Sequence, residues 1–250
     1  MSVTIKDVFF NDINYNRKKQ LLFAVMFPFF TLLALGIDSV SFSETYFDGR
    51  QLTNVLVIFY FSFFFWFSGS YLRKMMFVMV FLSYIGELLF CTLLKMYDYR
   101  TPVIPLYVPF GHAVVYASGY VYAYTKWSVS NDNLLRKCFA VAFALLFLAV
   151  GIFLNDLFSL IFGVFFFLLL KRKRWQNVYY FIAVCVIIIE LAGTHFQCWK
   201  WRPQTFALIP TINPPMGAVF FYIGGDILLV KIVGFWESKK RMSVSLNSKE

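Results

Sequence analysis

Charged residues are scarce in this chain, and their scarcity excludes a soluble globular protein. They make up 14% of the 250 residues, whereas soluble domains average about 25%. Hydrophobic residues reach 60%, 33 residues are phenylalanine, and the mean hydropathy is +0.68. A soluble fold cannot cover so much apolar surface, and intrinsic disorder requires low hydrophobicity. The composition predicts an integral membrane protein with almost no extramembrane domain.

The chain also lacks the motifs of familiar chemistry and of nucleic-acid binding. Its four cysteines are dispersed, with no C-x-x-C pair and no zinc-finger spacing. No G-x-S-x-G, H-E-x-x-H, Walker A or G-x-G-x-x-G sequence is present. Basic residues outnumber acidic ones by 23 to 13, but they form short runs between apolar stretches. Such runs are typical of membrane orientation signals, so we expect the lipid bilayer and no nucleic acid as a partner.

Eight apolar stretches approach the length of a membrane-crossing helix, about 17–25 residues. The fifth and sixth are separated only by Asn155 and Asp156. The fold prediction is an all-α polytopic membrane protein with eight transmembrane helices in two parallel four-helix repeats. The predicted spans are Leu21–Ile37, Val55–Leu72, Met75–Leu94, Ile104–Tyr124, Phe139–Leu154, Leu157–Leu170, Tyr179–Gly193 and Met216–Val233.

The distribution of lysine and arginine predicts the orientation of these spans. With eight spans, 17 of the 23 basic residues fall on one side and five on the other, and Lys231 lies inside the last span. The positive-inside rule therefore places both termini in the cytoplasm, and we expect a bacterial inner membrane. The predicted divisions are a cytoplasmic N-terminal segment (1–20), two four-helix repeats (21–126 and 136–236) and a cytoplasmic C-terminal tail (237–250).

An internal repeat underlies the division into two halves. The segment 109–119 (PFGHAVVYASG) recurs at 215–225 (PMGAVFFYIGG), where Pro, Gly, Tyr and Gly return at one offset of 106 residues. Two upstream features correspond in the same order: Glu87 with Glu190, and YDYR at 97–100 with WKWR at 199–202. Four spans per half would make the halves parallel, related by a pseudo-two-fold axis along the membrane normal. The alternative is chance similarity between phenylalanine-rich segments.

Ionisable groups inside a membrane are costly, and each is a functional-site hypothesis. Glu87 and Glu190 both fall about 20 Å or slightly more from the predicted cytoplasmic edge, at about 1.5 Å per helical residue. His112 enters the fourth span from outside, and His195 follows Glu190 by five residues. We predict that four catalytic groups face one cavity in the outer half of the membrane: Glu87, His112, Glu190 and His195.

Proline-rich stretches at 101–109 and 210–215 support a site beside these groups. Neither stretch can be regular helix throughout. Interrupted segments at matching places in two halves point to a binding site. Arginines there would hold an anionic head group, and aromatic rings an apolar or cationic part, although an outer aromatic belt explains the rings more simply. The predicted substrate-binding residues are Arg100, Arg202, Tyr97, Tyr99, Trp199, Trp201 and Asp226.

Each of these residues also has a structural explanation. Glu87 and Glu190 could be protonated and hydrogen-bonded to Ser, Tyr or backbone of a facing helix, or paired with Arg100 and Arg202. His112 could be a satisfied polar residue. Two glutamates and two histidines are suitable metal ligands by type, but no ligand spacing supports a metal site, so none is predicted and no cofactor is assigned.

Three functions are compatible with these features. The first is an intramembrane enzyme that uses the paired glutamates for acid–base chemistry on a hydrophobic or lipid-like substrate in an outward-facing cavity. The second is a small proton-coupled carrier whose halves rock. The third is a scaffold or assembly subunit with a membrane-protein partner. The stretch from Glu190 to Thr194, followed by Trp199, Trp201 and then a proline-punctuated span, also resembles the pattern of carotenoid-hydratase-type membrane proteins. It includes no motif specific to them, and we assign no membership.

Overall fold

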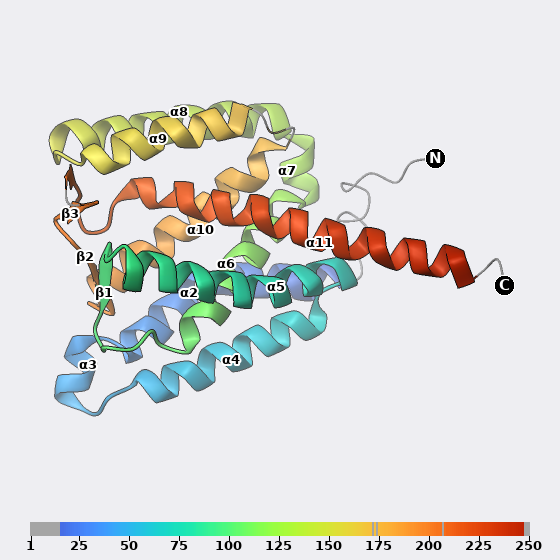
Figure 1. Cartoon of the computed structure of the whole chain (residues 1–250). Helices are drawn as coiled ribbons and strands as arrows, with labels where there is room; N and C mark the ends of the chain where they lie inside the picture. The colour runs from blue at the N-terminus through green and yellow to red at the C-terminus, as the bar shows by residue number, and fades with distance from the viewer. Residues whose placement is uncertain (1–15, 172, 174, 207, 248–250) are drawn as a thin grey trace.

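The computed structural model is mostly helical (Figure 1). It describes residues 16–171, 173, 175–206 and 208–247, and residues 239–247 by backbone alone. Six helices are long and apolar enough to cross a membrane. The fold is that of an all-α integral multi-pass membrane protein. The six are α2 (Arg17–Ile37), α4 (Arg50–Phe67), α5 (Ser70–Glu87) with its π-helical continuation η1 (Leu88–Leu93), α8 (Asp132–Phe153), α10 (Gln176–His195), and α11 (Val219–Asn247) with the preceding 3-10 turn η2 (Met216–Ala218).

Two of the eight predicted spans correspond to shorter helices. The fourth contains α6 (Tyr107–Ala123), of 17 residues, and the sixth contains α9 (Leu157–Lys171), of 15 residues. The structure thus has six candidate spans where the sequence predicts eight. It also contains short elements that the sequence analysis did not predict: α3 (Val40–Thr45), α7 (Lys126–Ser130), β1 (Tyr97–Tyr99), β2 (Trp199–Trp201), β3 (Gln204–Thr205) and β4 (Ile209–Pro210).

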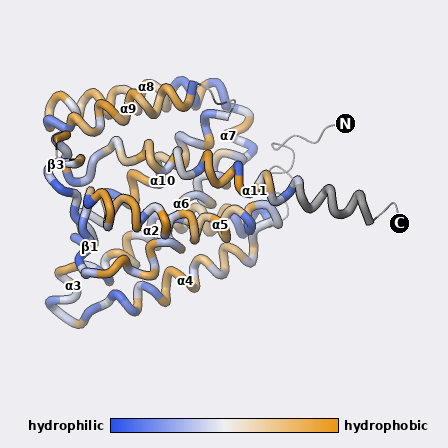
Figure 2. Tube along the Cα trace, viewed as in Figure 1, coloured by the Kyte–Doolittle hydropathy of each residue, from blue (hydrophilic) through white to orange (hydrophobic). Residues whose placement is uncertain are grey.

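The long helices run up and down, so their connections gather at two ends of the bundle (Figure 1). One end, the ladder end, carries α3, β1 and β2. The opposite end, the basic end, carries α7 and the start of α2. In Figure 2, hydrophobic residues run along the helices and hydrophilic residues gather at the two ends. The basic end holds most of the lysines and arginines counted on the predicted cytoplasmic side, although Lys6, Arg172, Arg174 and Lys249 lie outside the described residues.

The centre of the bundle is α6. Thirteen of its 17 residues are buried, and α2, α4, α5 and α10 all pack against it. Close approach to α10 depends on Gly119, because a Cβ atom there would lie 2.6 Å from Cγ1 and 2.9 Å from Cα of Ile182. Small residues allow such approach between membrane helices. A helix surrounded by protein needs no lipid-facing side, so α6 can carry polar groups.

The periphery of the bundle is apolar. Phe59, Trp66, Leu145 and Phe153 are 59–82% exposed, on α4 and α8. In water, a surface with so many exposed large apolar side chains would aggregate, whereas hydrocarbon chains of lipids solvate it. The outer faces of the helices are therefore suited to contact the bilayer.

The fifth and sixth predicted spans are separate helices, as the sequence indicates. The break falls at Asn155, whose φ of 55° is left-handed, and Asp156 caps α9 by accepting from the backbone N–H of Ser159 at 3.1 Å. The Ser159 hydroxyl donates to the other carboxylate oxygen and accepts from the backbone N–H of Gly217 at 2.8 Å. This turn joins α8 and α9 side by side and attaches them to the start of α11.

The two proline-rich stretches have irregular backbone, as predicted. After β1, no regular element forms until α6 begins at Tyr107, three residues later than the predicted start of the span. After β2, the chain forms the small β3–β4 ladder and then η2 before α11 begins. Both stretches lie at the ladder end, and they connect β1 to α6 and the β3–β4 ladder to η2 and α11.

Candidate functional site

The strands β1 and β2 form an antiparallel ladder that joins two distant parts of the chain. Asp98 lies opposite Lys200, and the aromatic residues pair as Tyr97 with Trp201 and Tyr99 with Trp199. Side chains alternate along a strand, so the four aromatic rings share one face, and Asp98 and Lys200 are exposed on the other. Three of the four aromatic residues are less than 9% exposed. The interpretation as an outer aromatic belt is wrong, because these rings point into the protein.

Glu190, on α10, is held by the two tryptophans of the ladder. The indole Nε1–H groups of Trp199 and Trp201 both donate to Oε2 at 3.0 Å. The hydroxyl of Tyr222 donates to the other oxygen, Oε1, at 3.1 Å. Gly193, one turn further along α10, has no side chain, and the ring of Trp199 occupies the space that a Cβ would fill. The glycine thereby lets the indole lie close enough to reach Glu190.

Glu87, at the end of α5, is held in a matching way by the two tyrosines of the ladder. The hydroxyls of Tyr97 and Tyr99 both donate to its Oε2 at 2.7 Å. The other oxygen, Oε1, lies 3.6 Å from Nε2 of His112. The helix widens into the π-helical turn η1 directly after Glu87, and such turns recur at functional sites. The alternative that the glutamates pair with Arg100 and Arg202 does not hold, because their partners are tyrosine, tryptophan and histidine.

His112 lies between the two glutamates. Its Nδ1 contacts the backbone carbonyl of Val108 at 3.1 Å, and its Nε2 contacts the hydroxyl of Tyr222 at 3.2 Å. Three of the four predicted catalytic residues are therefore brought together. His195 is not: it is exposed at the C-terminal end of α10, its ring packs against Phe196, and it lines neither of the cavities described below.

Two cavities meet at this group of side chains. One lies beneath the ladder among α2, α4, α6 and α10. The other lies among α5, α6 and α11. Apart from the shared group, mostly apolar residues line both, and no lysine or arginine does so in the described part of the chain. Six residues line both cavities: Glu87, Tyr97, His112, Glu190, Trp201 and Tyr222.

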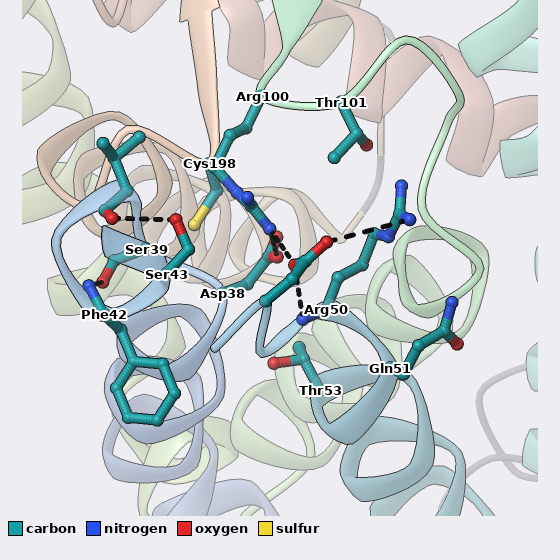
Figure 3. Close-up of polar contacts among 12 residues, drawn as sticks. Asp38, Ser39, Phe42, Ser43, Arg50, Gln51, Thr53, Arg100, Thr101 and Cys198 are labelled. Atoms are coloured by element: carbon teal, nitrogen blue, oxygen red, sulfur yellow. Dashed lines mark hydrogen bonds and ion pairs between the residues drawn. The ribbon is translucent and has the colours of Figure 1, made fainter. Parts of the chain in front are cut away.

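The two predicted arginines lie at the ladder end, outside both cavities, and each is paired with aspartate. A terminal nitrogen of Arg100 lies 2.7 Å from Oδ1 of Asp38 and 2.6 Å from Oδ1 of Asp48, and Figure 3 shows the side chain pointing into this cluster. Arg202 contacts both carboxylate oxygens of Asp98 at 2.9 Å. The guanidinium of Arg100 lowers the pKa of Asp48, and that of Arg202 lowers the pKa of Asp98.

Asp226 lies on α11, closer to the basic end than Tyr222. It is fully buried, and the Tyr120 hydroxyl donates to its Oδ1 at 2.6 Å. It lines neither cavity. The structure thus places this predicted substrate-binding residue below the site and not in it.

Several residues of the site and its surroundings were not predicted from the sequence. Tyr222 connects His112 to Glu190, yet it appeared only as the counterpart of Tyr116 in the repeated motif. Asp38 accepts a hydrogen bond from the Tyr107 hydroxyl at 2.8 Å, and thereby joins α2 to the start of α6. The alternation in YDY and WKW was a usable signal for the strands, because a period of two places the aromatic residues on one face.

No protein-family model, curated protein or solved structure matches this chain. Within the described residues, no group of three His, Cys, Asp or Glu side chains lies close enough to hold a metal ion. All four cysteines are free thiols.

Proposed function

We propose that this protein is an intramembrane enzyme that uses Glu87 and Glu190 for acid–base chemistry on a hydrophobic or lipid-like substrate. The observation that carries the proposal is the matched placement of the two carboxyl groups. Each has one oxygen held by two aromatic donors and presents the other, Oε1, to the pair His112 and Tyr222. Acid–base catalysis needs a carboxyl group held within hydrogen-bond reach of the proton that it transfers.

The lining of the cavities supports an uncharged, apolar substrate. An anionic head group would need a cation, but Arg100 and Arg202 are engaged by aspartates outside the cavities. The wall contributed by α2 and α4 consists of Phe, Ala, Leu and Val with one threonine. An extended apolar chain that ran through both cavities would place its middle beside the two glutamates. The substrate class we propose is therefore a long, uncharged lipid.

We further propose that the two halves are parallel four-helix repeats. Two contacts join residues one repeat apart: the Tyr116 hydroxyl donates to the carbonyl of Tyr222, and Tyr120 donates to Asp226, each across 106 residues. Equivalent residues can touch only near a symmetry axis. Both contacts follow α6 and α11 below the centre of the ladder, which supports an axis along the helices and so along the membrane normal.

The proposed orientation places the basic end and both termini in the cytoplasm, in a bacterial inner membrane, and the ladder end outside. Its support is the positive-inside rule applied to the connections at the two ends of the bundle. The cavities then open towards the outer half of the membrane. A carrier is the second candidate, and Asp226 is the observation in its favour. Because Asp226 does not line either cavity, the enzyme is the better supported of the two.

The test uses membranes that contain the full-length chain, incubated with a total lipid extract and analysed by mass spectrometry. We expect one apolar lipid to be converted by the unaltered protein. Glu87→Gln and Glu190→Gln should abolish conversion, because glutamine keeps the shape of the side chain but has no titratable proton. Glu44→Gln is the matched control, since Glu44 is exposed on α3, away from the site. Full conversion by both site variants, or no conversion by any protein, would overturn the proposal.

A further inference from the structure

We infer that His112 and Glu190 share a single proton through the hydroxyl of Tyr222, and that the pair takes up and releases this proton as one unit. The inference concerns the site of the proposed function, but it follows from the hydrogen-bond partners alone. It can be tested in the resting protein, without a substrate.

The backbone carbonyl of Val108 determines the tautomer of His112. A carbonyl oxygen only accepts hydrogen bonds, so Nδ1, 3.1 Å away, must carry a hydrogen. A neutral imidazole has one N–H group, and Nδ1 holds it. Nε2 is then a bare acceptor in the neutral ring and a donor only in the cation.

The Tyr222 hydroxyl has one hydrogen and two contacts. It lies 3.2 Å from Nε2 of His112 and 3.1 Å from Oε1 of Glu190. A hydroxyl can donate to one of these atoms, so the other must supply a hydrogen of its own. Both contacts are hydrogen bonds, with the Tyr222 hydroxyl donating in one of them, when the pair holds one proton, either on Nε2 or on Oε1.

The tryptophans of the ladder determine which oxygen of Glu190 can carry that proton. Indole N–H groups are donors only, and two of them point at Oε2. Oε2 is therefore an acceptor in every state, and a protonated Glu190 carries its hydrogen on Oε1, facing Tyr222. When the proton moves, the bond from Nε2 to hydrogen breaks, the Tyr222 oxygen takes that hydrogen, and the original hydroxyl hydrogen passes to Oε1. Imidazolium and carboxylate become neutral imidazole and carboxylic acid.

The other titratable groups around this pair come from three elements. Glu87 of α5 presents Oε1 to Nε2 at 3.6 Å, so an ionised Glu87 favours the state with the proton on His112. Tyr97 and Tyr99 of β1 donate to Glu87, and Tyr116 of α6 donates to the backbone of Tyr222. α2 and α4 contribute no titratable side chain to the cavity wall among the described residues.

The histidine content of the chain makes the inference accessible to nitrogen NMR. The sequence holds two histidines, and His195→Gln removes the exposed one, which leaves His112 as the only labelled ring. We expect a protonated Nδ1 at every pH, and an Nε2 that changes between protonated and bare. A bare Nδ1 would overturn the inference.

Glu190→Gln tests the sharing itself. The two indoles require the amide oxygen at the Oε2 position, so the amide N–H₂ group faces Tyr222 and donates to it. Tyr222 must then donate to Nε2, and the protonated Nε2 signal should be lost across the pH range in which the unaltered protein shows it. In a Tyr222→Phe background the same change should have no effect. Tyr116→Phe, which removes a hydroxyl outside the relay, is the matched control and should leave the response intact.

Unchanged Nε2 signals in a folded Glu190→Gln protein would overturn the relay. If the Glu190→Gln protein does not fold, a pH titration of the His195→Gln protein tests the relay. The Nε2 signal and the infrared band of the buried carboxylic acid should then change with one midpoint. Two separate midpoints would refute a shared proton. The outcome is distinct from that of the lipid-conversion test. If the Nε2 and carboxylic-acid signals titrate together but no lipid is converted, the shared proton is supported and the proposed enzyme activity is refuted. If lipid is converted but the two signals titrate separately, the enzyme activity is supported and the shared proton is refuted.

Discussion

Gly193 of α10 leaves room for the Trp199 indole, which donates to Glu190. Replacing this glycine by alanine tests whether the indole needs that room. A methyl group at position 193 would overlap the six-membered part of the Trp199 ring. That part of the indole is rigid, so the whole ring has to move. Its Nε1 then loses the hydrogen bond to Glu190.

The expected cost follows from these two effects. Inserting a methyl group into a packed interior costs about 1–3 kcal/mol, and a lost hydrogen bond about 0.5–1.5 kcal/mol. Alanine also gains about 1 kcal/mol over glycine within a helix, so we expect Gly193→Ala to lower the free energy of unfolding by about 0.5–3.5 kcal/mol. The measurement is equilibrium unfolding in mixed micelles, followed by the helical circular-dichroism signal.

A matched control and a second background make this prediction refutable. Gly224, on α11, has no heavy atom within 4 Å of an added Cβ, so Gly224→Ala should be neutral or stabilise by up to about 1 kcal/mol. In a Trp199→Phe protein, which lacks the overlapping ring, Gly193→Ala should cost at least about 1 kcal/mol less than in the unaltered protein. If Gly193→Ala resembles Gly224→Ala, or costs the same in both backgrounds, the indole does not lie against Gly193.

Three further predictions concern the ladder end. Arg100→Gln leaves the carboxylate of Asp38, whose side chain is 2% exposed, without its cation, and should cost about 3–5 kcal/mol of unfolding free energy. Arg202→Gln breaks an exposed pair that water screens, and should change the free energy of unfolding much less than Arg100→Gln does. Arg202 lowers the pKa of Asp98, so the small stabilisation by this pair should be complete above the ordinary aspartate pKa of about 3.9. It should disappear as the pH falls through the lowered pKa of Asp98. A difference in the free energy of unfolding between the unaltered and Arg202→Gln proteins that grows in acid would contradict this. Reporter fusions after Asp48, Met96, Asp156 and Lys200 should all report the outside, and a cytoplasmic report at Asp156 would remove α8 and α9 as separate crossings.

Much of the helical framework could be predicted from the sequence because it depends on local physical chemistry. Apolar runs of sufficient length become helices, proline at 102 and 105 prevents regular helix, and Asn155 with Asp156 forms a break because one tolerates left-handed backbone and the other caps a helix. The depth estimate for Glu87 and Glu190 was sufficient to place both beside His112. These inferences require only the rise per residue and the preferences of single residues.

The remainder depends on long-range pairing that no local pattern determines. Tyr97 meets Trp201 only because two distant loops form a ladder, and Arg100 meets Asp38 across 62 residues. Depth alone could not place His195, because a residue near the end of a helix can face either the bundle or its surroundings. The short length of α6 is consistent with its packing: α6 is enclosed by protein, so it does not need the length or apolarity of a lipid-facing span.

The ladder of β1 and β2 also has a mechanical consequence. It fastens the segment that follows α5 to the segment that follows α10, and the Arg202–Asp98 pair adds a second tie on its exposed face. A rocking motion that separated the two halves at this end would have to break those backbone hydrogen bonds together with the pair. A motion that pivoted about the ladder would leave them intact and spread the helices only at the opposite end. If the two proposed halves move relative to each other, we therefore expect the ladder to act as the hinge, with the larger displacement at the basic end.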